Sequence, residues 1–193
     1  MEPQTDELRW IEAAGRGNHE AFARLVEAYK TPVYNLAFRM LRNGSEAEDA
    51  AQEIFIRAYT KLATYDRERK FSTWLLSIAS NYCIDMIRRR RATLVDIDEM
   101  AFALPSDAPG PERNAINQEQ REAVARAVNQ LPDAYRLVTV LRYYNDCSYE
   151  EIERITGLSE ATVKTRLFRA RRQLEALLEA EGALPWTAES RAP

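Results

Sequence analysis

The chain has 193 residues, of which 46% are hydrophobic and 30% charged, a composition typical of a soluble globular protein with one large or two small domains. No apolar run approaches the roughly twenty residues that a membrane-spanning helix needs, and the first residues lack the pattern of a signal peptide, so we expect a cytoplasmic protein with no membrane insertion of its own. The net charge of −3 argues against tight DNA binding by charge alone.

Residues 1–92 are predicted to form a first helical domain. Apolar residues at helical spacing predict one helix over about 5–16, a second begun by Asn18, and a third begun by Pro32 and ended near residue 42. Ser45 has Glu48 three residues later, the pattern of a capping box, which predicts a further helix over 46–59.

The helix over 46–59 also has features of a protein interface. One helix cannot easily bury Ile54, Phe55 and Ile56 together, so we expect an exposed apolar residue among the charged ones. The polar side chains that the alanine-rich packed side leaves outward are Asp49, Gln52, Glu53 and Arg57.

The helix predicted over 71–91 combines a broad apolar stripe, which includes Trp74, with a polar side that carries Asn81. It runs into four arginines, Arg88, Arg89, Arg90 and Arg91, more cations than a helix C-terminus requires, which suits a nucleic-acid backbone. Tyr65 and Phe71 flank a basic loop before this helix, and aromatic residues beside cations are typical of proteins that stack unpaired bases.

Residues 93–117 interrupt the helical pattern. Three prolines and an acidic excess predict a flexible linker. Residues 118–181 then resume as a second helical domain, and 182–193 form a short tail. The predicted fold is therefore all-α, with two small domains joined by a flexible acidic linker.

The second domain is predicted to end in a helix-turn-helix. Ser148 and Glu151 form a capping box, Gly157 ends the short helix that they begin, and Ser159 caps a long amphipathic helix. The first half of such a second helix meets base edges and later cations meet phosphates. The candidates for DNA contact are Glu160, Lys164, Thr165, Arg166, Phe168, Arg169, Arg171 and Arg172.

Taken together, these motifs closely resemble the extracytoplasmic-function (ECF) sigma factors, the small two-domain class of bacterial RNA polymerase sigma subunits. The resemblance covers about 20–91 and 118–178. In the first domain it rests on the motifs over 48–55, 71–75, 78–81 and 85–88, and in the second on 131–132, 135–136, 148–152, 162–166 and 169–171.

The resemblance implies a protein that binds rather than catalyses, with no catalytic residue, cofactor or metal, whose partners are core RNA polymerase, promoter DNA and an anti-sigma factor that holds the two domains together. The second domain would read an upstream promoter element as duplex. The first would bind polymerase through Asp49, Gln52, Glu53, Phe55 and Arg57, and melt a downstream element with Tyr65, Phe71, Asn81 and the arginines 88–91.

Two other classes of protein share the second domain. A conventional helix-turn-helix regulator would explain that domain but leave the first without a role. A serine recombinase also ends in a helix-turn-helix, but it needs a strand-containing catalytic domain, and residues before 92 show only helical patterning.

Overall fold

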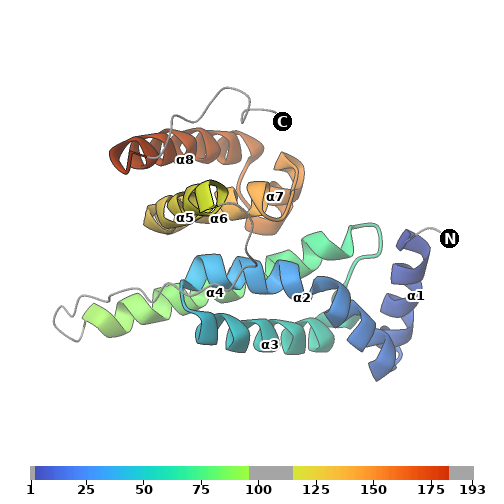
Figure 1. Cartoon of the computed structure of the whole chain (residues 1–193). Coiled ribbons are helices and arrows are strands. Elements are labelled where there is room, and N and C mark those ends of the chain that lie inside the picture. The colour runs from blue at the N-terminus through green and yellow to red at the C-terminus, as the bar shows by residue number, and fades with distance from the viewer. Residues whose placement is uncertain (1–2, 96–114, 183–193) are drawn as a thin grey trace.

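The computed structural model describes residues 3–95 and 115–182, and within these two ranges every regular element is a helix (Figure 1), which confirms the predicted fold class. The first half of the molecule contains α1 (Pro3–Gly15), α2 (His19–Leu41), α3 (Gly44–Lys61), the short 3-10 helix η1 (Leu62–Thr64) and α4 (Phe71–Val95). The second half contains α5 (Ala115–Gln130), α6 (Asp133–Tyr143), α7 (Tyr149–Thr156) and α8 (Glu160–Ala180).

Helix α2 corrects one boundary. The sequence predicts a new helix at Pro32, but the structure has one continuous helix with Pro32 inside it. A proline in a helix interior removes one backbone hydrogen bond and costs about 3 kcal/mol. The helix continues because Leu25, on one side of the proline, and Val33 and Leu36, on the other, are all fully buried.

Helix α3 corrects a second boundary. Its N-cap is Asn43, whose side chain accepts a hydrogen bond from the backbone N–H of Glu46 at 3.1 Å, and Ser45 lies within the helix. The predicted capping box of Ser45 and Glu48 is therefore wrong. An earlier start lets the N–H of Ala47 bond to the carbonyl of Asn43 at 3.0 Å, which adds to the helix ladder.

The core of the first half lies between α2, α3 and α4. Leu36 and Met40 of α2, Ile54 of α3 and Leu75 of α4 are almost completely buried. Helix α1 packs at the side of this core through Ile11 and Ala14. Asp49 and Gln52 of α3 and Asn81 of α4 are exposed on the outside of this core.

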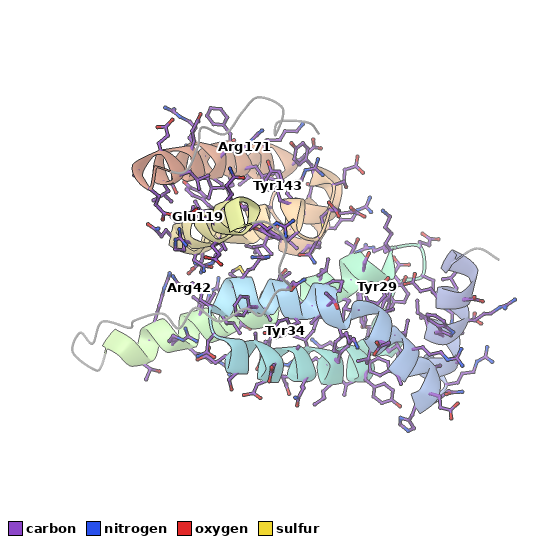
Figure 2. The ribbon with its side chains drawn as sticks, viewed as in Figure 1. Tyr29, Tyr34, Arg42, Glu119, Tyr143 and Arg171 are labelled. Atoms are coloured by element: carbon purple, nitrogen blue, oxygen red, sulfur yellow. The ribbon has the colours of Figure 1, made fainter. Side chains whose placement is uncertain are left out.

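The two halves pack directly against each other, with α6 and α7 of the second half against α2 and α4 of the first (Figure 1). Lys70 pairs with Glu151 at 2.8 Å, and Arg91 with Asp133 at 2.5 Å. Arg42, on the side of the first half that faces the second (Figure 2), donates to the carbonyl of Asn129 at 3.1 Å.

Most of the predicted linker lies outside the described residues. Helix α4 continues to Val95 and α5 begins at Ala115, so both helices extend into the range 93–117. Residues 96–114, and the tail 183–193, are not described.

Candidate nucleic-acid and protein interfaces

The helix-turn-helix forms as the sequence predicts. Ser148 and Glu151 make a reciprocal capping box, in which the Ser148 hydroxyl accepts from the Glu151 N–H at 3.1 Å and the Glu151 carboxylate accepts from the Ser148 N–H at 2.8 Å. Gly157 ends α7 with a φ of 70°, a conformation that glycine adopts at little cost. Ser159 then caps α8.

Buried side chains fix the orientation of α8. Ile152 and Ile155 of α7 pack in the same core as Val163 and Leu167 of α8, and all four are almost completely buried. With these residues turned inward, the opposite side of the first turns of α8 is exposed to solvent.

The exposed start of α8 carries the residues predicted to contact bases. Lys164 and Thr165 are exposed, and Lys164 pairs with Glu160 one turn earlier at 2.5 Å. The hydrogen bond that the Lys164 ammonium donates to Glu160, together with the negative charge of that carboxylate, raises the pKa of Lys164, so the ammonium stays charged at neutral pH. The Thr165 hydroxyl donates to the carbonyl of Ala161 at 2.9 Å, so its oxygen keeps two lone pairs that can accept hydrogen bonds.

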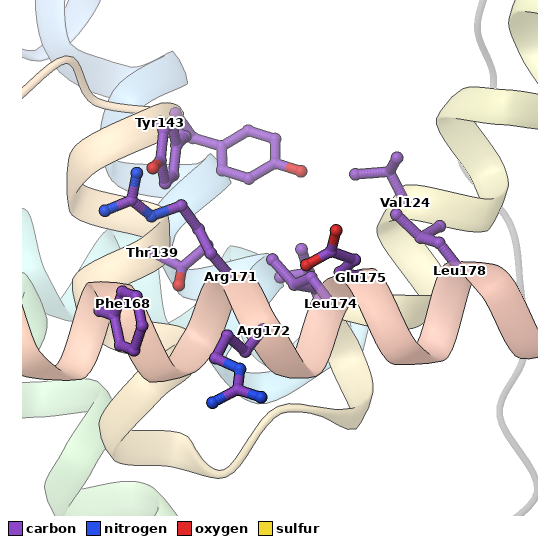
Figure 3. A pocket seen from close by; sticks show the side chains of 11 residues that line it. Val124, Thr139, Tyr143, Phe168, Arg171, Arg172, Leu174, Glu175 and Leu178 are labelled. Carbon is purple, nitrogen blue, oxygen red and sulfur yellow. The ribbon is translucent and has the colours of Figure 1, made fainter. Parts of the chain in front are cut away.

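The remaining α8 residues predicted to contact DNA fall into two groups, one on the helix surface and one beside a cavity. Arg166 is half-buried and Arg169 is exposed. Phe168, Arg171 and Arg172, by contrast, line a largely apolar cavity between α5, α6 and α8 (Figure 3). The structure thus places these three residues beside a feature that the sequence did not predict.

Helix α4 presents Asn81 to solvent, as predicted, and Asp85 is exposed one turn later. The four arginines after them are exposed but lie at successive positions around the helix, and the helix continues past them to Val95. Arg88 lies 3.9 Å from Asp85, and Arg90 pairs with Glu46 of α3. Because Arg91 pairs with Asp133, Arg89 is the one of the four with no ion pair within the described residues.

The aromatic residues around the loop 65–70 form a packed cluster. Phe71 is only 2% exposed, and its ring lies 5.4 Å from each of the rings of Tyr29, Tyr65 and Trp74. The prediction that Phe71 contacts an unpaired base is therefore wrong, because its ring supports the loop from inside. Trp74 packs as predicted, and the half-buried Tyr65 keeps part of its ring accessible.

Helix α3 exposes Asp49 and Gln52, while Glu53 and Arg57 pair at 2.8 Å along one side of the helix. Phe55 is 9% exposed and Ile56 is 59% exposed. The predicted surface role of Phe55 is thus wrong, and Ile56 is the exposed apolar residue of this helix. The run of three apolar residues indicated that one of them would be exposed. Adjacent helical positions point about 100° apart, and the sequence pattern alone did not show which of the three faces solvent.

The two cysteines, Cys83 and Cys147, are both free thiols and both buried. Burial raises the pKa of Cys83 and of Cys147 to about 12, so neither thiol ionises at neutral pH. Among the described residues no group of His, Cys, Asp and Glu is arranged to hold a metal ion. In the same ranges, every helix is too short or too polar to pass through a membrane.

Comparisons with known proteins agree with this arrangement. Residues 25–93 match the family model of sigma-70 region 2, and residues 121–174 match that of sigma-70 region 4. The chain is 40% identical over 172 residues to the ECF RNA polymerase sigma factor SigW of Bacillus subtilis (strain 168), covering 85% of this chain and 92% of SigW.

Solved structures show the same fold. CnrH, solved in complex with the cytosolic domain of CnrY, is 27% identical with a TM-score of 0.67, over 91% of this chain and 97% of CnrH. The sigma factor RpoE of Bartonella quintana, solved with the anti-sigma factor NepR, is 23% identical with a TM-score of 0.72, over 82% of this chain and 96% of that chain.

The two matched regions, each a helical unit and the second ending in a helix-turn-helix, define a sigma-70 type of protein. The chain belongs to the family of ECF RNA polymerase sigma factors. A conventional regulator does not account for the region 2 match, and a recombinase does not account for either match.

Proposed function

We propose that this sigma factor directs core RNA polymerase to specific promoters by reading an upstream element as duplex with its second half and melting a downstream element with its first. The observation that carries the proposal is the presence of two separate exposed polar surfaces, one at the start of α8 and one along α4, on the two halves of one chain.

Helix α8 would make the contact with duplex DNA. Lys164 and Thr165 stand where a recognition helix meets base edges, and the ion pair to Glu160 orients the lysine side chain along the helix. Arg166 and Arg169 follow on the same helix and are assigned to phosphates.

Asn81 would contact the melted strand, because its exposed amide has donors and an acceptor for the edge of an unpaired base. Arg88 and Arg89 extend this surface toward the backbone, and Tyr65 supplies an accessible aromatic edge at the start of the helix. Base unstacking costs a few kcal/mol, which these contacts and those of the polymerase would offset. The mechanism is therefore binding, with no chemical step performed by this chain.

The polymerase contact falls to the outer side of α3, where Asp49 and Gln52 flank an apolar surface made by Ile56. Exposed apolar side chains ringed by polar ones are typical of protein interfaces. Glu53 and Arg57 hold each other along the edge of this surface, and the Arg57 guanidinium lies 4.6 Å from the centre of the Tyr82 ring of α4.

An anti-sigma factor is proposed as a further partner. The solved relatives CnrH and RpoE are each bound to another protein, CnrY and the anti-sigma factor NepR respectively. In this chain the two halves already contact each other, so the partner would stabilise an existing arrangement rather than create one.

Run-off transcription tests the proposal. Core polymerase with this protein should start at specific sites, and the protein alone should bind those promoters weakly because its net charge is −3. Asn81→Ala should leave duplex binding intact and impair opening, and a pre-melted template should rescue it. Starts that do not depend on the protein, or tight promoter binding without polymerase, would contradict the proposal.

A further inference from the structure

Helix α1 lies beside the segment that joins α3 to α4, where it contacts η1 (Figure 1). Its residues precede the part of the chain that matches sigma-70 region 2, which begins at residue 25. Ile11 and Ala14 are almost completely buried, so α1 is fixed in its place against the rest of the first half. The contacts proposed above for DNA and polymerase leave this helix without a role.

An ion pair joins α1 directly to the loop 65–70. The Glu12 carboxylate lies 2.6 Å from the Arg67 guanidinium, across fifty-five residues of the sequence. The other ion pair of Glu12, to Arg16 of the same helix, is longer at 3.7 Å. The loop is therefore attached to α1 at Arg67, three residues before Lys70 pairs with the second half.

A hydrogen bond joins α1 to the aromatic cluster beside the loop. The Tyr29 hydroxyl donates to the Glu7 carboxylate. Burial, followed by this hydrogen bond, raises the pKa of Tyr29, so the hydroxyl stays protonated and keeps its proton to donate. The Tyr29 ring packs edge-on against Phe71, and Phe71 packs edge-on against Tyr65, each at 5.4 Å between ring centres. Glu7 thus connects to the Tyr65 ring through two aromatic contacts.

The loop itself is a turn closed by its own hydrogen bonds. The Asp66 carboxylate accepts from the Glu68 N–H at 3.0 Å, and the Asp66 carbonyl accepts from the Arg69 N–H at 3.1 Å. The Tyr65 hydroxyl donates to the Arg69 carbonyl. Because the turn is closed in this way, a contact at Arg67 also fixes the orientation of the Tyr65 ring.

We propose that α1 is a positioning element for the loop 65–70, in which Glu12 acts through Arg67 and Glu7 through Tyr29 to orient the Tyr65 ring toward an unpaired base. The inference rests on the proposed function, in which Tyr65 belongs to the surface that meets the melted strand. Glu7 and Glu12 are positioning residues rather than DNA contacts, because carboxylates repel phosphates. A loop that is oriented before DNA arrives avoids the ordering cost that binding would otherwise include.

Reversal of the Glu12–Arg67 pair tests the positioning without DNA. Glu12→Lys and Arg67→Glu each place like charges together, and the double variant restores an ion pair of opposite sense. Hydrogen exchange at the backbone amides of 65–70 should be about two- to fivefold faster in each single variant, as expected for an exposed ion pair, and should return to its original rate in the double variant. Glu27→Lys is the matched control, because it makes the same charge change at an ion pair of equal length within α2, to Lys30.

Base discrimination tests the consequence for promoter melting. Each variant is combined with core polymerase and bound to pre-melted templates that differ at single unpaired bases of the downstream element. Both single variants should lose about two- to fivefold of the discrimination between bases, and the double variant should regain it. Tyr29→Phe, which keeps the ring but removes the hydroxyl, should lose discrimination in the same way while circular dichroism shows unchanged helix content.

Unchanged loop exchange in both single variants would overturn the inference, and so would faster exchange with full base discrimination. A defect of Arg67→Glu that Glu12→Lys does not restore would also overturn it, because Arg67 would then contact the strand directly. The Asn81→Ala opening assay separates these results from a failure of the proposed function. If Asn81→Ala impairs opening while the ion-pair variants behave normally, the inference alone fails, whereas normal opening by Asn81→Ala contradicts the proposed melting surface itself.

Discussion

Lys164 and Arg169 lie five residues apart on α8, and this separation assigns them different parts of a DNA contact. Lys164 sits in the second turn beside Glu160, while Arg169 lies further along with no ion pair among the described residues. A base contact discriminates between sequences, whereas a phosphate contact adds affinity to all of them.

Replacing Lys164 by Ala should therefore relax sequence preference at one upstream position by about 1–3 kcal/mol. Arg169→Ala should weaken binding to all sequences alike and reduce by about one the slope of log K against log salt. Promoter titrations of the polymerase complex at several salt concentrations measure both effects. Arg126→Ala, an exposed arginine on α5, is the matched control, and equal loss of sequence preference in all three variants would contradict the assignment.

Phe55 and Ile56 are neighbours on α3 with opposite surroundings, which gives a paired prediction. Phe55→Ala removes a buried ring and should lower the free energy of unfolding by about 3–5 kcal/mol. Ile56→Ala changes a side chain that is 59% exposed, so stability should stay within about 0.5 kcal/mol while association with core polymerase weakens. Urea unfolding and polymerase pull-down separate the two outcomes, and an Ile56 variant that binds normally would remove Ile56 from the interface.

Single residues were harder to place from sequence than the helices that carry them. Asn81, Lys164 and Arg169 are exposed as their helical positions predict, because clear apolar stripes fix the opposite side of each helix. Phe55 and Phe71 were misplaced, since an aromatic residue beside charged neighbours has the same local pattern whether it packs inward or faces a partner. Packing from α2, which lies far away in sequence, decides these cases.

Helix ends show the same division between local and distant causes. The capping box at Ser148 forms as predicted, because the Glu151 carboxylate accepts from the Ser148 N–H. At the start of α3, Asn43 and Ser45 are both good caps, and the structure uses Asn43. At Pro32 the local rule favours a helix start, and burial on both sides of the proline overrides it.

The choice of cap on α3 can be tested by a matched pair of substitutions. Asn43→Ala should lower the free energy of unfolding by about 1 kcal/mol, because the N–H of Glu46 loses its acceptor. Ser45→Ala should be neutral or slightly stabilising, because alanine is the better helix former within a helix. Thermal or urea unfolding reports both, and a larger loss for the Ser45 variant would show that the helix begins later.

On the scale of the whole molecule, the halves share one hydrophobic core cluster, and polar contacts surround it. Besides the two ion pairs, the Arg39 guanidinium lies 3.5 Å from the centre of the Tyr144 ring, and the buried Arg136 donates to the carbonyl of Met40 at 3.4 Å. Interfaces between domains of one chain resemble transient protein complexes and separate more readily than cores do. We expect the halves to separate when both promoter elements are engaged.

Acid should weaken the docking of the halves through Glu151. Partial burial acts to raise its pKa, but hydrogen bonds from Lys70 and Ser148 outweigh burial and hold the pKa below its ordinary 4.5. A carboxyl with a depressed folded pKa stabilises the docked form at pH values above its ordinary pKa, and this stabilisation is lost as the pH falls through the folded value. Small-angle scattering should thus show expansion below pH 4.5, at a pH where circular dichroism still shows intact helices.

Glu151→Gln is the control for this titration. Glutamine keeps the capping box but carries no charge, so the variant should be more open at neutral pH and should lack the acid-dependent step. Lys70, the partner of Glu151, does not titrate in this acid range, because its pKa is raised above its ordinary 10.5 and the ammonium stays charged. Identical acid profiles for the two proteins would show that Glu151 does not control the docking.

The covalent connection between Val95 and Ala115 changes what these polar contacts can achieve. The docking of two separate proteins would depend on their concentrations, whereas the nineteen residues between the two helices hold the halves at an effective concentration on the order of millimolar. Opening and closing are then first-order events, so the fraction of open molecules is the same whether the cell makes few copies or many. Cleavage of the tether would make the open fraction depend on concentration, so that it rises on dilution.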